Sequence, residues 1–203
     1  MEYPSFFDDI PSITLYDPLA GFLGSTTDGI IQYNYLDVVK LTGHSCPTVA
    51  SAYWMTRMAL RGLYKDSLPS RGGVRVEFPQ LRTEGVTGVI ANVVQMITGA
   101  AGADGFKGLS GIFFRNDLMQ FGSGGDFNIR FVHREDMRRA DVSVDFSRIS
   151  RTRELAELLK RCVDGLSTNE ENLRFAKLWQ DRVKRLILGH GEDPEVFKLV
   201  LGR

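Results

Sequence analysis

Cysteine and histidine are scarce in this chain of 203 residues, which has two cysteines and three histidines. Two cysteines, Cys46 and Cys162, are too few for a disulfide framework or for an all-cysteine zinc site within one chain. A metal ion bound by a single chain would therefore need mixed ligands.

An excess of charge is also absent, since 25 basic and 25 acidic side chains give a formal net charge of zero. The 43% hydrophobic and 25% charged residues are ordinary for a soluble globular protein. Nucleic-acid-binding and membrane-surface proteins usually carry a marked basic excess. We therefore expect no nucleic-acid partner and no membrane partner.

Long apolar runs are lacking as well, because none reaches the roughly 18 residues that a membrane span requires. The N-terminal sequence MEYPSFFDDIPSITLYDP has acidic residues and prolines where a secretory signal needs a basic start and an apolar stretch. We expect a cytoplasmic protein. Its length suits one domain with appended elements or two small domains.

Several segments have helical periodicity, and the clearest begins at Pro47, which fits the first helical position because it lacks an N–H. Residues 1–29 predict a packed but irregular lead-in with little regular structure. Helices are predicted over about two turns within 30–44, over 47–64, 86–98, 152–164 and 167–188, and over a last short segment in DPEVFKLVL.

Strands are indicated where apolar residues alternate, over 74–78 and within a meander over 112–146. Strands and helices are segregated along the chain instead of alternating. The predicted fold class is therefore α+β, with a mostly antiparallel sheet of about four or more strands packed against the long helix, and with further helices at the C-terminus.

The segment GHSCP at 43–47 places one histidine and one cysteine next to the start of the long helix. Ser45 or Cys46 is the expected N-cap. Exposed N–H groups and the helix dipole favour negative charge there, so a thiolate at Cys46 is stabilised. An imidazole and a thiolate are ligands that zinc prefers, although zinc takes about four. His44 and Cys46 are therefore the candidate metal ligands.

The preceding helix adds two further candidates, because Asp37, Lys40 and His44 are spaced i, i+3 and i+7 and share one face. Asp37 could bind the metal directly or orient the imidazole. Lys40 would favour the anionic form of a neighbouring acid or thiol. We expect these residues to line a pocket together with the glycine-rich segment TGAAGADGFKGLSG, which either cradles an anion or is a long loop that needs positive φ values.

Structural roles compete with these interpretations. A free cysteine is often simply buried, and a histidine at a helix start can cap or pack. Cys162 lies on the apolar stripe of its predicted helix, and His133 and His190 lie in polar segments where solvation is expected. A Cys46–His44 nucleophilic pair is an alternative that lacks an evident third orienting group.

The segment GHSCPTVASAYWMTRMAL resembles the signature of the FmdE-like family of formylmethanofuran dehydrogenase components, in which a Gly-His-x-Cys-Pro segment opens a long helix. The downstream segment GVTGVIANVVQMITGAAGADGFKGL is similar to that family's second segment. The resemblance covers about residues 30–147. Thr42 stands where the family often carries a further histidine, and Ala100 where it often carries a further cysteine.

The resemblance implies an α+β core domain over residues 1–150, with residues 151–203 as a helical extension in place of the family's C-terminal zinc finger. It also implies a homodimer and a metal-associated pair at His44 and Cys46. The leading hypothesis is a protein that holds a divalent metal, with zinc as the expected ion, and acts on a small molecule of unknown identity. Cys46, Asp37 and Lys40 are its candidate catalytic residues. The alternatives are a non-catalytic binding or assembly module and a cysteine-based enzyme without metal.

Overall fold

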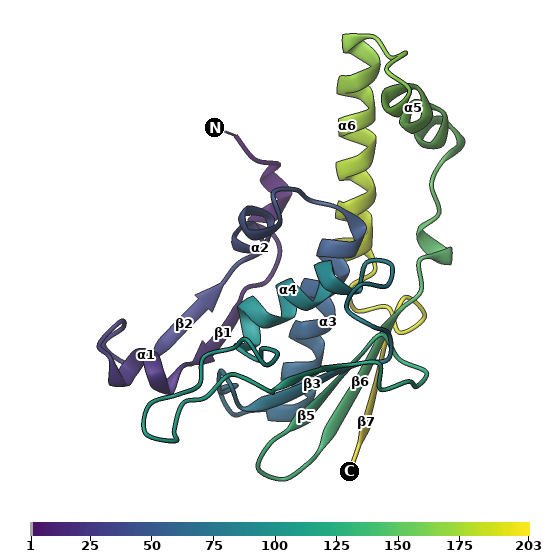
Figure 1. Ribbon diagram of the computed structural model, residues 1–203. Helices are drawn as coiled ribbons and strands as arrows, with labels where there is room; N and C mark the ends of the chain where they lie inside the picture. The colour runs from purple at the N-terminus through teal and green to yellow at the C-terminus, as the bar shows by residue number, and fades with distance from the viewer. Residues whose placement is uncertain (1) are drawn as a thin grey trace.

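The computed structural model describes residues 2–203 (Figure 1). Its α-helices are α1 (Pro18–Phe22), α2 (Tyr35–Thr42), α3 (Pro47–Tyr64), α4 (Thr87–Thr98), α5 (Arg153–Val163) and α6 (Asn169–Lys184). Its strands are β1 (Ile13–Tyr16), β2 (Ile30–Tyr33), β3 (Val74–Phe78), β4 (Met119–Phe121), β5 (Ile129–His133), β6 (Arg139–Val144) and β7 (Phe197–Gly202). Short 3-10 turns cover Ser5–Phe7 and Ser147–Ile149, and a π-helical turn, Arg185–Gly189, continues α6.

Five strands form the main sheet, in the order β4-β3-β5-β6-β7. Only β3 and β4 are parallel, and the other neighbours are antiparallel. Alternation along β3 buries Val74, Val76 and Phe78 and leaves Arg75 and Glu77 partly exposed, as a strand with one covered face requires. The predicted α+β class and mostly antiparallel sheet are confirmed.

Helix α3 covers one face of this sheet and contacts β5, β6 and β7 (Figure 1). It begins at Pro47 with Cys46 as its N-cap and continues to Tyr64, as its apolar periodicity predicts. Tyr53, Met55 and Leu60 are fully buried or nearly so. A buried side chain of this size contributes roughly 1.5–3 kcal/mol to stability, so α3 supplies much of the core energy.

The N-terminal 29 residues contain more regular structure than their prolines and glycines predict. Strand β1 pairs with β2 in a two-stranded antiparallel sheet. Ile13 and Leu15 are buried on one face of β1, whereas Tyr16 is exposed. The prediction of an irregular lead-in is therefore wrong, because four alternating residues become a strand once they have a partner.

The C-terminal segment also differs from the prediction. Helices α5 and α6 form as expected and pack side by side in an arm that projects from the body (Figure 1). Residues 193–201 were expected to form a short helix, but β7 runs antiparallel to β6 and buries Phe197. The short segment VFKLVL is compatible with a helix or a strand, and the free edge of β6 decides the outcome.

Within residues 2–203, none of the helices has the length and apolar character needed to cross a membrane.

Candidate functional site

The turn before α3 holds the motif residues in a fixed arrangement. The Cys46 Sγ accepts the Val49 N–H at 3.5 Å, which makes the thiol the N-cap of α3. The Ser45 carbonyl accepts the Trp179 indole N–H and a Gln180 amide N–H, both at 3.1 Å. Helix α6 is therefore attached directly to the turn that carries His44 and Cys46.

The candidate residues around this turn are spread over the surface. His44 is exposed, and its Nδ1 donates to the Thr42 carbonyl at 3.0 Å because a carbonyl can only accept. Asp37 forms a capping box with Asn34 at the start of α2, and Lys40 is exposed in the last turn of α2.

These residues do not gather into one metal centre. Asp37 and Lys40 line an open cavity with Tyr33 and Met96, but His44 and Cys46 do not line it. Within residues 2–203, no three His, Cys, Asp or Glu side chains are grouped closely enough to hold a metal ion. His44 and Cys46 alone, as two candidate donors, do not fit a complete zinc centre.

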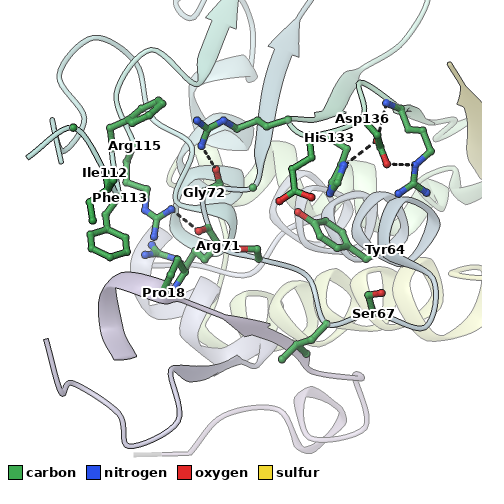
Figure 2. Close-up of a pocket in the computed structure, with 18 residues that line it drawn as sticks. Pro18, Tyr64, Ser67, Arg71, Gly72, Ile112, Phe113, Arg115, His133 and Asp136 are labelled. Carbon is green, nitrogen blue, oxygen red and sulfur yellow. Dashed lines mark hydrogen bonds and ion pairs between the residues drawn. The ribbon is translucent and has the colours of Figure 1, made fainter. Parts of the chain in front are cut away.

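A larger cleft lies at the opposite end of α3, with a volume of about 760 Å³ (Figure 2). Its wall comes from the segment between α3 and β3, the loop before β4, and the β5–β6 turn. The lining is rich in arginine and includes Arg71, Arg115, Arg134 and Arg138. We call this site the arginine cleft.

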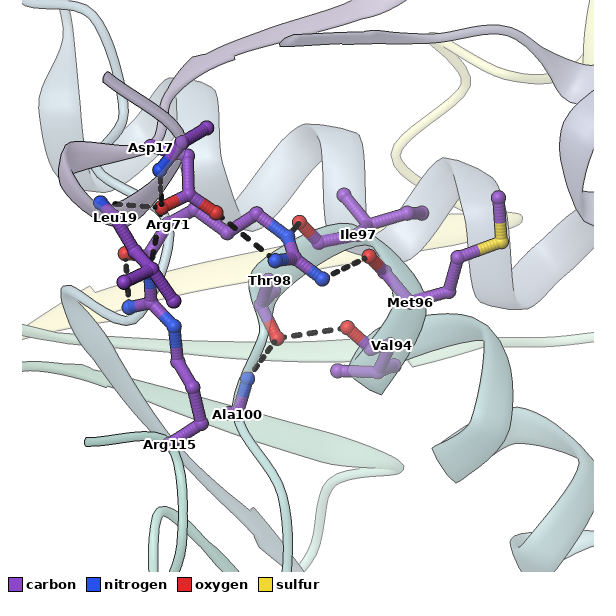
Figure 3. Close-up of polar contacts among 10 residues, drawn as sticks. Asp17, Leu19, Arg71, Val94, Met96, Ile97, Thr98, Ala100 and Arg115 are labelled. Carbon is purple, nitrogen blue, oxygen red and sulfur yellow. Dashed lines mark hydrogen bonds and ion pairs between the residues drawn. The ribbon is translucent and has the colours of Figure 1, made fainter. Parts of the chain in front are cut away.

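Two of these arginines share one carboxylate, that of Asp17 (Figure 3). The Arg71 Nη1 lies 3.0 Å from Asp17 Oδ2, and the Arg115 Nη2 lies 2.8 Å from Asp17 Oδ1. Asp17 is also the N-cap of α1 and accepts the N–H groups of Leu19 and Ala20. Asp17 is 3% exposed and Arg115 is 7% exposed, so the group is an internal ion cluster.

Arg71 ties the cluster to the end of α4. It donates from Nη2 to the Met96 carbonyl at 3.0 Å and from Nε to the Ile97 carbonyl at 3.2 Å. The last carbonyls of a helix lack intrahelical partners and carry partial negative charge, so they favour a cation. The Nε, Nη1 and Nη2 atoms of Arg71 each donate to an acceptor, so the role of this side chain is structural.

Arg115 is less completely satisfied. It donates from Nη2 to Asp17 and from Nη1 to the Arg71 carbonyl. Its Nε is buried and, among residues 2–203, has no hydrogen-bond acceptor. Burial lowers the pKa of the Arg115 guanidinium, Asp17 raises it, and the positive charges of Arg71 and Arg134 lower it further. Positive charge is therefore in excess at this end of the cleft.

The Asp17 carboxylate responds to the same cluster. Burial raises its pKa, but the hydrogen bond from Arg71 and the charge of Arg115 outweigh burial, so the pKa lies below the ordinary 3.8. Two guanidinium groups against one carboxylate leave a net charge of plus one.

Histidine occupies the other end of the cleft, beside the β5–β6 turn (Figure 2). His133 is 8% exposed, and its Nδ1 lies 2.9 Å from Asp136 Oδ1. The ring of Tyr64 meets the imidazole edge-on, with 4.9 Å between centroids. The prediction that His133 is solvated is wrong, because α3 covers the end of β5. His190 pairs with Asp193 at 3.0 Å and remains partly exposed.

The glycine-rich segment contributes to the cleft and not to the His44 turn. Gly99, Gly108 and Gly111 have positive φ values, as a long loop with tight bends requires. Gly111 lines the cleft, and the following Ile112 and Phe113 give it an apolar wall (Figure 2).

The sequence offered one signal for the arginine cleft. Asp17 followed by Pro18 is the pattern of an N-cap and a first helical residue, and it marks a carboxylate held at a helix start. The sequence pattern did not identify the arginines as site residues, because Arg71, Arg115 and Arg134 are far apart in the chain.

Residues 41–193, which cover most of the chain, match the sequence model of a family described as "FmdE, Molybdenum formylmethanofuran dehydrogenase operon". No curated protein matches the chain. The matched range includes His44 and Cys46 and also Arg71, Arg115 and Arg134, whereas Asp17 lies before it.

Proposed function

This chain belongs to the FmdE family, and we propose that it binds a small anionic molecule in the arginine cleft. The family's description names a molybdenum formylmethanofuran dehydrogenase operon, which supports a role associated with that enzyme. The anion carries a carboxylate or phosphate group, since these are the anions that guanidinium groups recognise.

One observation carries the proposal: two guanidinium groups share the Asp17 carboxylate at the margin of an open cleft. A buried charge without a counter-ion is costly, and an anion in the cleft would offset the excess. The Arg115 Nε lacks an acceptor among the described residues but is buried, so an anion would be held by the guanidinium groups that line the cleft.

Arg134 is the most useful residue for a test, because it lines the cleft but is itself exposed. Its Nη1 donates to the Gly72 carbonyl at 2.7 Å, and its guanidinium lies over the Phe114 ring at 4.4 Å. Replacing Arg134 therefore removes a cleft charge without opening the Asp17 cluster.

The test is calorimetric titration with inorganic phosphate and with acetate. We expect Arg134→Met to weaken binding by about tenfold, the effect of losing one charge-assisted hydrogen bond of about 1.4 kcal/mol. Arg153→Met is the matched control, because Arg153 on α5 is almost fully exposed, pairs with Glu157 and does not line the cleft. Equal binding by the wild type and Arg134→Met would overturn the proposal.

A divalent metal at His44 and Cys46 is the second candidate. It is supported by the exposure of His44 and by the position of the Cys46 thiol at the helix N-terminus, two residues away. Since one copy supplies two donors, we propose that a second copy completes the ligand set, with zinc as the expected ion. The homodimer and the cytoplasmic location are part of this proposal.

Metal analysis of gently purified protein tests this candidate. We expect Cys46→Ser to lower the zinc content several-fold and Cys162→Ser, which removes the other cysteine, to leave it unchanged. If the zinc content is negligible in the wild type, in Cys46→Ser and in Cys162→Ser, then Cys46 is a helix cap and the two residues are not a metal site. The rate of thiol alkylation against pH then tests the remaining cysteine-based alternative.

A further inference from the structure

The arginine cleft is larger than a single anionic group requires. Its volume of about 760 Å³ lies within the range of roughly 300–1,000 Å³ typical of sites for whole organic ligands. An inorganic anion bound at Arg115 would leave most of the cleft empty. The molecule that fits is therefore extended and reaches the end occupied by His133.

The His133 end is built so that one ring nitrogen remains available. The Asp136 carboxylate accepts from His133 Nδ1 at 2.9 Å and from Arg138 Nε at 2.8 Å. Desolvation raises the pKa of Asp136, but the hydrogen bonds from Arg138 and His133 lower it to about 2, so the carboxylate is ionised and accepts. The Nδ1 therefore carries a proton. Among residues 2–203 the other nitrogen, Nε2, has no hydrogen-bond partner.

We infer, on the premise of the anion-binding cleft proposed above, that the ligand is an extended dianion with acidic groups at both ends, one at Arg115 and Arg134 and the other at His133 Nε2. Arg115 and His133 come from different elements and lie on opposite sides of Gly72 (Figure 2). Arg134 follows His133 in the chain, and its guanidinium reaches back to the Gly72 carbonyl. A linear dicarboxylate, or a carboxylate with a terminal phosphate or phosphonate, has this chemistry.

Contact with an anion gives His133 a proton-linked role. A neutral imidazole whose Nδ1 carries the proton cannot donate from Nε2, whereas an imidazolium donates from both nitrogens. Binding of the second acidic group is therefore accompanied by uptake of one proton from solvent. The proposal therefore predicts that the dianion binds more tightly at lower pH, where proton uptake is easier.

Other titratable and charged groups line the cleft around this imidazole. Tyr64 comes from α3, and the β5–β6 turn contributes Arg134, Glu135, Asp136 and Arg138. Two carboxylates and two guanidinium groups of this turn therefore line the cleft beside the imidazole. An incoming acidic group adds to the carboxylate side, which is why proton uptake accompanies binding.

The experiment compares two-headed and one-headed probes of matched length. Glutarate and adipate are titrated against pentanoate and hexanoate at pH 6 and at pH 8.5, and 3-phosphonopropionate separates a phosphonate end from a carboxylate end. We expect dicarboxylates to bind about tenfold more tightly than monocarboxylates at pH 6, with the advantage reduced several-fold at pH 8.5. Titrations in two buffers of different ionisation enthalpy should show uptake of about one proton near pH 7.

His133→Gln should keep monocarboxylate binding and lose both the advantage of the dicarboxylate and the proton uptake. His190→Gln is the matched control, since His190 has the same pairing with an aspartate three residues later but does not line the cleft. The wild-type measurements stand even if His133→Gln does not fold.

The outcomes separate the two proposals. If no carboxylate binds in a manner that depends on Arg134, the anion-binding function itself fails. If monocarboxylates and dicarboxylates bind equally well, with a dependence on Arg134 but without proton uptake, only the role of His133 is overturned.

Discussion

Asp17 serves three partners with one carboxylate. It caps α1 and neutralises half of the charge on Arg71 and Arg115. Because these partners come from segments about 54 and 98 residues away, the carboxylate also fixes the N-terminal hairpin to the main sheet. A change at this residue therefore affects the cleft and the stability of the whole fold.

Asp17→Asn should lower the free energy of unfolding at pH 7 by about 3 kcal/mol, the usual cost of breaking a buried ion pair from one side. The amide keeps the size of the side chain but leaves the guanidinium groups without a counter-ion. Urea unfolding measures the change, and Asp66→Asn at an exposed position is the control. A loss below about 1 kcal/mol would show that the cluster contributes little.

The pH dependence of that loss follows from the lowered pKa of Asp17. A carboxyl whose pKa is lower in the folded than in the unfolded protein stabilises the fold above the ordinary value of 3.8. Its contribution falls as the pH drops through the folded-state value. The difference between the wild type and Asp17→Asn should therefore be constant above about pH 5 and shrink below about pH 4.

Gly72 is a second residue on which the cluster depends. Its φ is +81°, and a Cβ there would overlap Arg115 Nη1, so an alanine must displace the guanidinium. We expect Gly72→Ala to cost about 3 kcal/mol or more and to weaken phosphate binding. Gly111→Ala has the same strain, with φ +82° and no atom within 4 Å of the new Cβ, and should cost only about 1–2 kcal/mol. Equal costs for both would mean that backbone strain alone decides the effect.

At the level of elements, sequence periodicity predicted α3, α4, α5 and α6, because each has an apolar face or a capping signal within its own sequence. β7 could not be predicted in the same way. Leu199 pairs with Val142 and Phe197 with Val144, so the strand exists because β6 offers an edge. Such information is not local to residues 193–201.

The same limit applies to the candidate site. His44 and Cys46 are close in sequence, and the N-cap role of Cys46 was one of two expected positions. The arginine cleft draws on segments around residues 17, 71, 115 and 133 that only the tertiary fold brings together. Local patterns predict the elements and their caps, whereas charge pairing between distant loops appears only in the folded chain.

The contact between α6 and the GHSCP turn makes a prediction about Cys46. Trp179→Phe keeps an aromatic ring but removes the indole N–H that binds the Ser45 carbonyl. Gln180 still donates to that carbonyl, so the loss should be about 1 kcal/mol or less. In a Cys162→Ser background, the reaction of Cys46 with a small maleimide should become several-fold faster. Leu173→Ala, at an exposed position on the same helix, should leave the rate unchanged.

At the scale of the whole molecule, the proposed metal site at His44 and Cys46 predicts that metal binding and association are linked. A two-fold axis that passes through the metal would bring the same pair from each copy and give two histidines and two cysteines, a ligand set that suits tetrahedral zinc. Metal and dimer should then be lost together.

Sedimentation and metal analysis on one sample test that link. We expect about one zinc per two chains, a dimer that dissociates when a chelator is added, and monomers for both His44→Gln and Cys46→Ser. Cys162→Ser should remain dimeric and loaded, because its thiol lies on α5 and not in the motif turn. A dimer that remains after the metal has been removed would show that dimerisation does not depend on metal binding. The proposed metal would then lack its second pair of ligands, since each copy offers two candidate donors.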